Sequence, residues 1–492
     1  MTPPHAREKR PLAALLAPDI LELLEEAPES VGPQTEEMHP ADLADIAESI
    51  PVDKVRALLA ALSSERAAEV LEYLDDDLRT QVLEELTARE AASIIEEMTP
   101  DERVDALDEL DDETADEILS EMGAEAQAET ERLLEYDPYT AGGLMTTEFV
   151  SVAENMTVED ALTSVRAMAR AGRREAMYTI YTTDANGRLH GVMSLRELLA
   201  APEGARIIDV AWSEVVSVPP DMLQEEASQI ISNYDLVALP VVDTERRLLG
   251  VVTVDDAIDV IQEEQTEDAQ KFGGMEAIEE PYMQTALPTM IRKRAGWLAV
   301  LFVGELFTST AMQHYEHSLQ KALVLSLFIP LIISSGGNSG SQATSLIIRS
   351  LALREVTVRD WWKVAMRELP SGLALGGILG LIGVGRILLW QTMFNHAWHV
   401  GGFRFAGIDV GQFTLGYDYG VYVNRIALTI GISVLGVVTV GSLSGSMLPF
   451  LLRRAGFDPA SASAPAVATL VDMAGIVIYF TVASILLSGT LL

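Results

Sequence analysis

The chain has 492 residues, of which 74 are acidic and 34 are basic, so its formal net charge at pH 7 is −40; it contains no cysteine. The missing cysteines exclude disulfides, Cys-ligated zinc sites, iron–sulfur clusters and thiol nucleophiles, and the negative charge opposes binding to nucleic-acid phosphates. The length predicts about three domains. We expect no enzyme activity, because the sequence shows no P-loop, His-rich metal motif or nucleophile–base signature.

The charge is divided unevenly between two parts of the chain. Residues 1–280 carry 65 acidic and 20 basic side chains, whereas residues 281–492 carry 9 and 14. This division predicts a soluble acidic body followed by a membrane domain. The start of the chain, MTPPHAREKRPL, lacks the apolar core and cleavage site of a signal peptide, so we expect the acidic body to stay in the cytoplasm.

A repeat of twelve residues runs through positions 38–122. Most repeats contain a helix-start signal, such as Ser63-Ser64 or Thr99-Pro100, followed by apolar residues at helical spacing. This pattern predicts short helices stacked into an all-α superhelical domain. One long coiled coil is the alternative, but a period of twelve fits neither a heptad nor an eleven-residue repeat. The recurring residues are Met38, Ile50, Leu62, Leu74, Leu86, Met98, Leu110 and Met122.

A second repeat has the character of β-strands. RLHGVMSLRELL at 188–199 and RLLGVVTVDDAI at 247–258 align at a constant offset, and each follows a β-branched run. Amphipathic helices are expected upstream of each copy, near 157–170 and 222–233. Such tandem strand–turn–strand–helix units resemble paired CBS modules, of the cystathionine-β-synthase type. In that family the pairs sense ligands, often adenosine nucleotides.

The resemblance to CBS modules extends to a ribose-binding motif. Thr253 and Asp256 in the second module match the family's Thr-x-x-Asp, which implies that ATP is a candidate ligand there. In the first module Ser194 is followed by Glu197, a departure from that motif. Asp256 has a second interpretation, as a simple helix cap, because Asp is a preferred capping residue.

A highly charged helix is expected from about 260 to 285, leading to the first membrane span. Its carboxylates recur at i, i+3 and i+4 spacing, which destabilises an isolated helix by about a few tenths of a kcal/mol per like-charge pair. A solvated face is the usual explanation of a charge run, but this density favours bound cations. The carboxylates are Asp255, Asp256, Asp259, Glu263, Glu264, Glu267 and Asp268.

Five apolar stretches are long enough to cross about 30 Å of hydrocarbon as helices. Lys and Arg concentrate before the first stretch and in the connections after the second and the fourth. By the positive-inside rule, this predicts a multi-pass protein of the cell (inner) membrane with a cytoplasmic N-terminus and an external C-terminus. The spans are expected near 295–314, 322–348, 366–391, 423–452 and 465–489.

The second span contains the polar sequence IPLIISSGGNSGSQATSLIIRS at 329–350. Pro330 removes a helix hydrogen bond, and Asn338 and Gln342 add amide oxygens. Polar groups at this depth are tolerated only against protein or a water-filled cavity, which indicates that water reaches this face. The alternative is a packing face of small residues, which is common between membrane helices.

The fifth span carries one charge, Asp472. A carboxylate at the centre of a membrane helix costs about 2.5–3.5 kcal/mol on insertion scales, so we expect it to be functional. An ion pair with Arg386 of the third span is the structural alternative. Glu305 in the first span is a second intramembrane acid, which could instead face a headgroup or a cavity.

Together these features resemble the MgtE family of magnesium channels and transporters over nearly the whole chain. The motifs that carry the resemblance are AGGLM (141–145), TVDDAIDV (253–260), TED (266–268), PLIISSGGNSGSQ (330–342), MLPFLLRRAGFDPA (447–460) and ATLVDMAG (468–475). The expected fold is that of a multidomain membrane protein. Its parts are an N-terminal segment (1–37), a helical-repeat N domain (38–135), two CBS modules (136–203 and 204–263), a connecting helix (264–294) and a five-helix transmembrane domain (295–492).

The resemblance also implies functional residues. Asp472 matches the carboxylate at which the ion is selected in the pore, Asp458 matches an acidic position near the cytoplasmic mouth, and Asn338 is a third pore candidate. Family members are homodimers with the pore on the two-fold axis, so the implied partners are a second copy, the lipid bilayer and Mg²⁺. The implied regulatory Mg²⁺ ligands are Glu69, Asp101, Asp105, Glu225, Asp235, Asp256, Asp259, Glu264, Glu267 and Asp268.

We therefore expect a Mg²⁺ channel or transporter that is gated by intracellular Mg²⁺ bound to its acidic domains. Mg²⁺ is a hard ion that often binds through one or two carboxylates while keeping several waters, and soft metals would favour cysteine ligands. Two alternatives stay open. One is a transporter of another divalent cation, such as Co²⁺, Mn²⁺ or Ni²⁺; the other is a membrane-anchored nucleotide or ion sensor that transports nothing.

Overall fold

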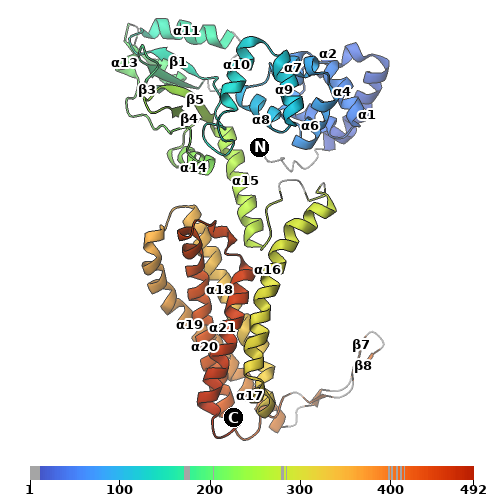
Figure 1. Ribbon diagram of the computed structural model, residues 1–492, viewed down its shortest axis with the longest axis vertical. Coiled ribbons are helices and arrows are strands. Elements are labelled where there is room, and N and C mark those ends of the chain that lie inside the picture. Colours follow the sequence, from blue (N-terminus) through green and yellow to red (C-terminus); the bar gives the residue numbers. More distant parts are fainter. Residues whose placement is uncertain are drawn as a thin grey trace. The chain divides into compact units, whose positions relative to one another are not determined.

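The computed structural model describes residues 11–170, 178–202, 204–278, 282–283, 285–396 and 416–491, with four short strands between the last two ranges. It divides into two compact units. The acidic unit comprises Met1–Gln265 with Glu279–Pro281, and the membrane unit comprises Thr266–Ile278 with Tyr282–Leu492. Figure 1 shows the helices and strands of both units.

The acidic unit begins with α1 (Pro11–Glu26), a short 3-10 turn and α2 (Val31–Thr35), followed by eight short helices. These eight helices begin at a constant spacing of twelve residues, and each packs against the helix two places further along. The predicted stack of capped helices is thereby confirmed. The helices are α3 (Pro40–Ala47), α4 (Val52–Ala60), α5 (Ser64–Leu71), α6 (Asp76–Glu85), α7 (Ala88–Ile95), α8 (Pro100–Asp108), α9 (Asp112–Glu121) and α10 (Ala124–Leu133).

A buried arginine joins α6 to the end of α8 within the repeat. The side chain of Arg79 on α6 is 1% exposed and binds Glu109 with two nitrogens and Asp76 with one. Burial disfavours the charged guanidinium, but the adjacent Glu109 outweighs that effect and the pKa of Arg79 is raised. An ion pair inside a protein is stable only while both partners are present, because a lone buried charge is strongly destabilising.

We expect Arg79→Met to lower the free energy of unfolding by about 3–5 kcal/mol, since Glu109 and Asp76 then lose their counter-charge. Urea denaturation of the full chain followed by circular dichroism measures this loss. Arg56→Met is the matched control, because the Arg56–Glu90 pair is exposed and is expected to contribute less than about 1 kcal/mol. Equal losses in the two variants would contradict the structural role of Arg79.

The CBS pair follows in the same unit. Its first sheet has the order β1-β2-β3 with β1 parallel to β2, and its second sheet pairs β4 with β5 antiparallel. Both predicted strand–turn–strand–helix copies are confirmed; β1, a four-residue strand, is an addition. The elements are β1 (Val150–Ala153), α11 (Val158–Arg170), β2 (Thr179–Thr183), β3 (Leu189–Ser194), α12 (Leu195–Ala200), α13 (Ile207–Val210), α14 (Gln224–Tyr234), β4 (Ala238–Val242) and β5 (Leu248–Thr253).

The charged helix differs from the expectation at its end. α15 covers Val254–Phe272 and stops well before residue 285. Gly273 and Gly274 follow, and Gly274 has a φ of +80°, a backbone conformation that terminates helices and favours glycine. The next helix, α16, starts only at Leu287, with a proline in its first turn. The predicted connecting segment 264–294 is therefore not one continuous helix.

The membrane unit contains five helices that are long and apolar enough to cross a bilayer, as predicted. α18 packs against α20 and α21, α19 against α20, and α16 along α21. The main elements are α16 (Leu287–His314), α17 (Glu316–Lys321), α18 (Ile329–Ala352), α19 (Trp361–Asn395), β6 (His399–Val400), β7 (Phe403–Phe405), β8 (Ile408–Val410), β9 (Phe413–Thr414), α20 (Val423–Arg454) and α21 (Ala464–Leu487). Short 3-10 turns at Leu323–Phe328, Val358–Asp360 and Pro459–Ser461 complete it.

Candidate functional site

The acidic unit contains a pocket lined mainly by carboxylates. The pocket encloses about 450 Å³, including space open to solvent, and the described residues that line it include five acids but no base. α8 contributes three of the acids and the first turns of α15 contribute two, so distant parts of the sequence meet there. The lining residues are Asp101, Glu102, Asp105, Pro138, Gly143, Leu144, Gln224, Asp256, Asp259 and Val260.

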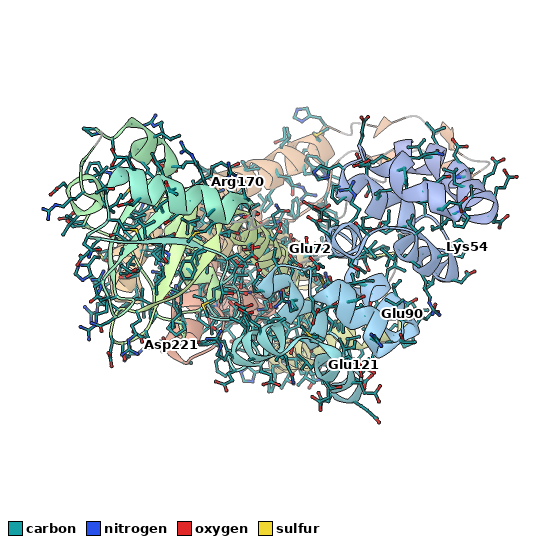
Figure 2. The ribbon with its side chains drawn as sticks, turned by 90° about the horizontal axis from the view of Figure 1, so that it is seen from above. Lys54, Glu72, Glu90, Glu121, Arg170 and Asp221 are labelled. Carbon is teal, nitrogen blue, oxygen red and sulfur yellow. The ribbon has the colours of Figure 1, made fainter. Side chains whose placement is uncertain are left out.

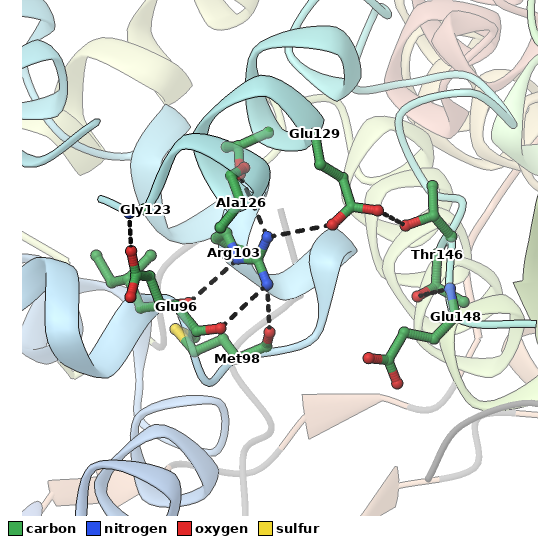
Figure 3. A network of polar contacts seen from close by, with 11 residues as sticks. Glu96, Met98, Arg103, Gly123, Ala126, Glu129, Thr146 and Glu148 are labelled. Carbon is green, nitrogen blue, oxygen red and sulfur yellow. Dashed lines mark hydrogen bonds and ion pairs between the residues drawn. The ribbon is translucent and has the colours of Figure 1, made fainter. Parts of the chain in front are cut away.

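A buried arginine fixes the orientation of α8. Arg103 donates hydrogen bonds to the carbonyl oxygens of Ile95 and Met98 at the end of α7, at 3.2 and 3.0 Å. It also forms an ion pair with Glu129 of α10 at 3.6 Å, and Glu129 accepts a hydrogen bond from Thr147 in the segment before β1. Figure 3 shows this network around the guanidinium. Arg103 thus holds α8 between its neighbours, so that the acids on α8 have a fixed backbone.

The pocket acids hold their protons more tightly than free carboxyls do. Burial, followed by the repulsion of Asp105, raises the pKa of Asp101 to about 6. Burial also raises the pKa of Glu102, Asp105 and Asp256. For Glu102 and Asp256, neighbouring carboxylates of the same pocket raise the pKa further. Two carboxylate oxygens, Asp101 Oδ1 and Glu102 Oε2, are buried without a hydrogen-bond partner. No described residue that lines the pocket is basic, and the nearest counter-charge is Arg79, whose guanidinium lies 3.9 Å from Glu102 Oε2.

Glu72, which directly follows α5, extends the acidic cluster toward Glu69. Burial raises the pKa of Glu72 to about 7, and the carboxylates of Asp101 and Glu69 raise it further, whereas a hydrogen bond from the Thr99 amide lowers it. In Figure 2 Glu72 lies toward the middle of the view, whereas Lys54 and Glu121 lie at the periphery. The sequence analysis missed Glu72, Glu102 and Gln224, because only tertiary packing distinguishes them from other surface residues of their helices.

The structure brings together four of the predicted regulatory residues, Asp101, Asp105, Asp256 and Asp259. Three others from the acidic unit lie elsewhere. Glu69 is ion-paired with Arg66 at 2.7 Å. Glu225 and Asp235 lie at opposite ends of α14, and both are exposed.

The remaining predicted acids occupy the later turns of α15 and the loop before α21. Lys271 forms ion pairs with Glu267 at 2.5 Å and with Asp458 at 2.7 Å. Asp458 also accepts a hydrogen bond from the Ala460 amide, so it caps the short 3-10 turn there. Glu264 and Asp268 lie on the same stretch of α15, and neither lines the acidic pocket.

The predicted ribose motif has a local role in this structure. Thr253 Oγ1 donates a hydrogen bond of 2.5 Å to Asp256 at the start of α15. α15 begins at Val254, so Asp256 is its third residue and this contact lies within the first helical turn; the role of Asp256 as a simple helix cap stays an interpretation. The carboxylate of Asp256 also lines the acidic pocket, so it belongs to the cluster as well as to the helix start.

The donor set of the pocket suits a hard divalent ion. Among the described residues no three His, Cys, Asp or Glu side chains converge closely enough to hold a metal directly. Mg²⁺ needs no such cage, because it keeps several waters and uses one or two carboxylates. Asp101 Oδ1, a buried carboxylate oxygen without a hydrogen-bond partner, suits such an ion.

In the membrane unit, the polar residues of α18 divide into two faces. Gly336, Gly340 and Ser339 are buried, and a Cβ at Gly340 would lie 2.7 Å from Val467 on α21 and 3.0 Å from the Gly441 carbonyl oxygen on α20. Asn338 lies on the opposite side, in line with Ser334 and Gln342, and all three are exposed. The small residues pack, as the alternative predicts, and the amides are exposed on the opposite side; that water reaches them stays a prediction. We call Ser334, Asn338 and Gln342 the polar stripe.

Asp472 lies on α21 within hydrogen-bonding reach of Glu305 on α16. The alternative partner, Arg386, stacks instead on the ring of Trp390 in its own helix, at 4.9 Å from the ring centroid. Among the described ion pairs, none joins Arg386 to Asp472. The intramembrane acid is therefore not neutralised by that arginine.

An acidic helical repeat, a CBS pair and a five-helix membrane unit define a multi-pass membrane protein of the transporter class. Residues 329–482 match the MgtE family, described as a divalent cation transporter; residues 38–139 match the MgtE intracellular N domain, and residues 141–204 and 207–263 match CBS domains. The chain belongs to the MgtE family.

Curated relatives agree with this assignment. The chain is 38% identical to the magnesium transporter MgtE of Thermus thermophilus over 74% of this chain and 73% of that protein. It is 33% identical to the magnesium transporter MgtE of Enterococcus faecalis over 73% and 72%. A crystal structure of the cytosolic domain of the Mg²⁺ channel MgtE in complex with ATP is 37% identical, covers 50% of this chain and 100% of that one, and has a TM-score of 0.46.

The pH dependence of stability tests the electrostatics of the pocket. A carboxyl whose pKa is raised by folding adds stability while it is protonated, and this stability is lost as the pH rises from its unfolded-state pKa through its folded-state pKa. For Asp101 and Glu72 this window extends from about 4 to about 7. We expect the metal-free protein to unfold at a higher temperature at pH 6 than at pH 8, measured by circular dichroism with a chelator present.

The double variant Glu72→Gln/Asp101→Asn should lose part of this pH dependence, because its side chains no longer titrate. Glu121→Gln is the matched control, since Glu121 is exposed at the end of α9. The electrostatic argument fails if the unfolding temperature is the same at both pH values, or if the double variant keeps the full difference.

Proposed function

We propose that this protein conducts Mg²⁺ across the membrane through a path lined by Asp472 and the polar stripe, and that Mg²⁺ bound to the acidic pocket closes this path. The observation that carries the proposal is the presence of a carboxylate and exposed amides on membrane helices of a chain that belongs to a divalent cation transporter family. The relatives named magnesium transporters support Mg²⁺ as the cargo.

The polar stripe supports a path shared by two copies. Ser334, Asn338 and Gln342 are exposed on a single chain, and polar groups at this depth do not face lipid. A homodimer in which two α18 helices face a common water-filled axis satisfies them. Two Asp472 carboxylates then suit a largely hydrated divalent ion. Asp458 would lie near the intracellular mouth, with the N-terminus inside the cell and the C-terminus outside.

The acidic pocket supports regulation by the cargo. Without a bound cation, the acids of α8 and those of α15 repel one another; a bridging ion would draw the two helices together. α15 is continuous to Phe272, which packs against Ile348 and Ala462 in the membrane unit. A shift of α15 would therefore reach the membrane helices directly.

ATP is a proposed ligand of the second CBS module. Thr253 and Asp256 would hold its ribose, and the ATP-bound cytosolic domain of a related Mg²⁺ channel supports the idea. Asp256 would then be shared between the nucleotide and the acidic pocket. Mg²⁺ remains the favoured cargo over Co²⁺, Mn²⁺ or Ni²⁺, because the relatives are named magnesium transporters. The oxygen ligands of the proposed path suit Mg²⁺, but they suit Mn²⁺ as well.

Asp472→Asn should keep the fold but lose most Mg²⁺ flux, because an amide supplies no net charge to hold the ion. Flux into liposomes containing the purified protein measures this. Glu316→Gln is the matched control, since Glu316 lies exposed on α17 outside the spans. Wild-type flux in Asp472→Asn would contradict the proposed path.

Replacing Asp101, Asp256 and Asp259 together by Asn should remove the regulatory site. The change removes repulsion as well as ligands, but repulsion is screened within about 8 Å at physiological salt, whereas a bridging ion fixes two helices. We expect Mg²⁺ to protect the wild-type acidic unit from proteolysis but not the variant, and flux in the variant to persist at Mg²⁺ levels that stop the wild type.

Asp209→Asn, a change at an exposed ion pair with Arg206, is the control for this experiment. If added Mg²⁺ leaves the proteolysis of the wild type unchanged, the acidic pocket is a solvated surface and the regulatory part of the proposal is wrong.

A further inference from the structure

The first and last membrane helices form a close, parallel contact. Trp297 on α16 donates a hydrogen bond of 3.1 Å to Ser463, immediately before α21. Near the other end, the ring of Tyr315 stacks on Phe480 with centroids 4.8 Å apart. Contacts of this kind at both ends keep α16 alongside α21 over most of its length, so residues at equal heights face each other.

Gly304 allows α16 and α21 to approach each other closely, one helical turn before Asp472. A Cβ added at Gly304 would lie 2.7 Å from Thr469 Cγ2 on α21, closer than side chains normally approach. The following residue, Glu305, lies within hydrogen-bonding reach of Asp472, one turn beyond Thr469. Two carboxylates at such a distance in a medium of low dielectric constant repel strongly unless they share a proton or a cation lies with them.

A third oxygen lies on the same face of α16. Thr308 is one turn beyond Gly304 and Glu305, and it is the buried residue of this helix, at 8% exposure. Its hydroxyl has no hydrogen-bond partner, not even the carbonyl one turn earlier that such hydroxyls often use. Buried polar groups almost always have a partner, so an unpaired hydroxyl on the helix face that holds Glu305 indicates a missing ligand.

Few other polar groups compete for this position. In the part of α18 that packs on α21, between Ile329 and Ile348, the described side chains carry no charge. α20 carries charges only near its ends, at Arg425, Arg453 and Arg454. Among the described residues of α16, α18, α20 and α21, every charge other than Glu305 and Asp472 therefore lies near a helix end.

We propose that Glu305, Asp472 and the Thr308 hydroxyl form one divalent-cation site inside the membrane, so that each subunit supplies two carboxylates to the transported ion. This inference rests on the proposed function, in which Asp472 lies on the ion path. Oxygen ligands from one or two carboxylates, with waters completing the octahedron, are what Mg²⁺ accepts. The second carboxylate sets selectivity, because a doubled negative charge favours divalent over monovalent ions.

The test measures Mg²⁺ flux against Mg²⁺ concentration, with Na⁺ as competitor, for the full chain in liposomes. We expect Glu305→Gln to raise the half-saturating Mg²⁺ concentration about ten-fold or more and to weaken discrimination against Na⁺. Glu305→Asp, which keeps the charge, should recover most of the discrimination. Thr308→Val, which keeps the shape but not the oxygen, should shift half-saturation in the same direction by a smaller factor.

Glu316→Gln is the matched control, because it removes a glutamate charge from the same chain outside the spans. The inference is overturned if Glu305→Gln titrates like Glu316→Gln while Asp472→Asn loses flux; the proposed function then stands without the second carboxylate. If Asp472→Asn keeps wild-type flux, the proposed function itself fails, and the inference with it. If Glu305→Gln does not fold, the Thr308→Val variant provides the test. The inference is then overturned if Thr308→Val has the half-saturating Mg²⁺ concentration of the wild type.

Discussion

The burial of carboxylates beside other carboxylates is the constraint on which the rest of this structure depends. Five acids line one pocket of the acidic unit, and no described lining residue there is basic. Arg79 reaches only Glu102 among the described acids of this pocket, at 3.9 Å, and burial of a charge without a close partner costs free energy. The proposed divalent cation would reverse the sign of this contribution and stabilise the protein through the same residues.

Two arginines next to the acidic pocket hold its helices in place. Arg79 and Arg103 are both almost fully buried, and both neutralise or orient groups next to the pocket. Arg103 uses its guanidinium mainly for backbone carbonyls, which fixes α8 without neutralising Asp101. The acids on α8 consequently keep a defined geometry, whereas their charge remains available for an ion. α15 then links the pocket to the membrane unit as one unbroken helix.

Much of this architecture is visible in the sequence, because its periodicities are local. The twelve-residue repeat predicts the stacked helices and most of their starts, since most units carry their own cap, such as Ser63 or Asp111. The membrane spans follow from composition. The sequence analysis places the end of the charged helix near residue 285, whereas α15 ends at Phe272. The Gly273-Gly274 pair is a helix-end signal, but the acidic run before it favours a longer helix.

The site was predictable only in part, because pairing between distant helices leaves no local signal. Asp101 and Asp256 were recognised through family motifs, but Glu102 and Glu72 join the cluster only through packing of α8 against its neighbours. Glu69 is drawn to Arg66 instead. Likewise, nothing in the first span predicts that Glu305 meets Asp472, since Gly304 makes this approach possible only once α16 lies along α21.

A distance measured within the acidic unit tests the central claim most directly. Because the chain contains no cysteine, spin labels can be attached to cysteines introduced by Glu121→Cys on α9 and Asn233→Cys on α14, both at exposed positions. If Mg²⁺ bridges α8 and α15, adding it to the full-length protein should shorten and narrow the distribution of distances between the labels. A distribution that Mg²⁺ leaves unchanged, relative to an equal ionic strength of Na⁺, would contradict the claim that the acidic pocket is the regulatory cation site.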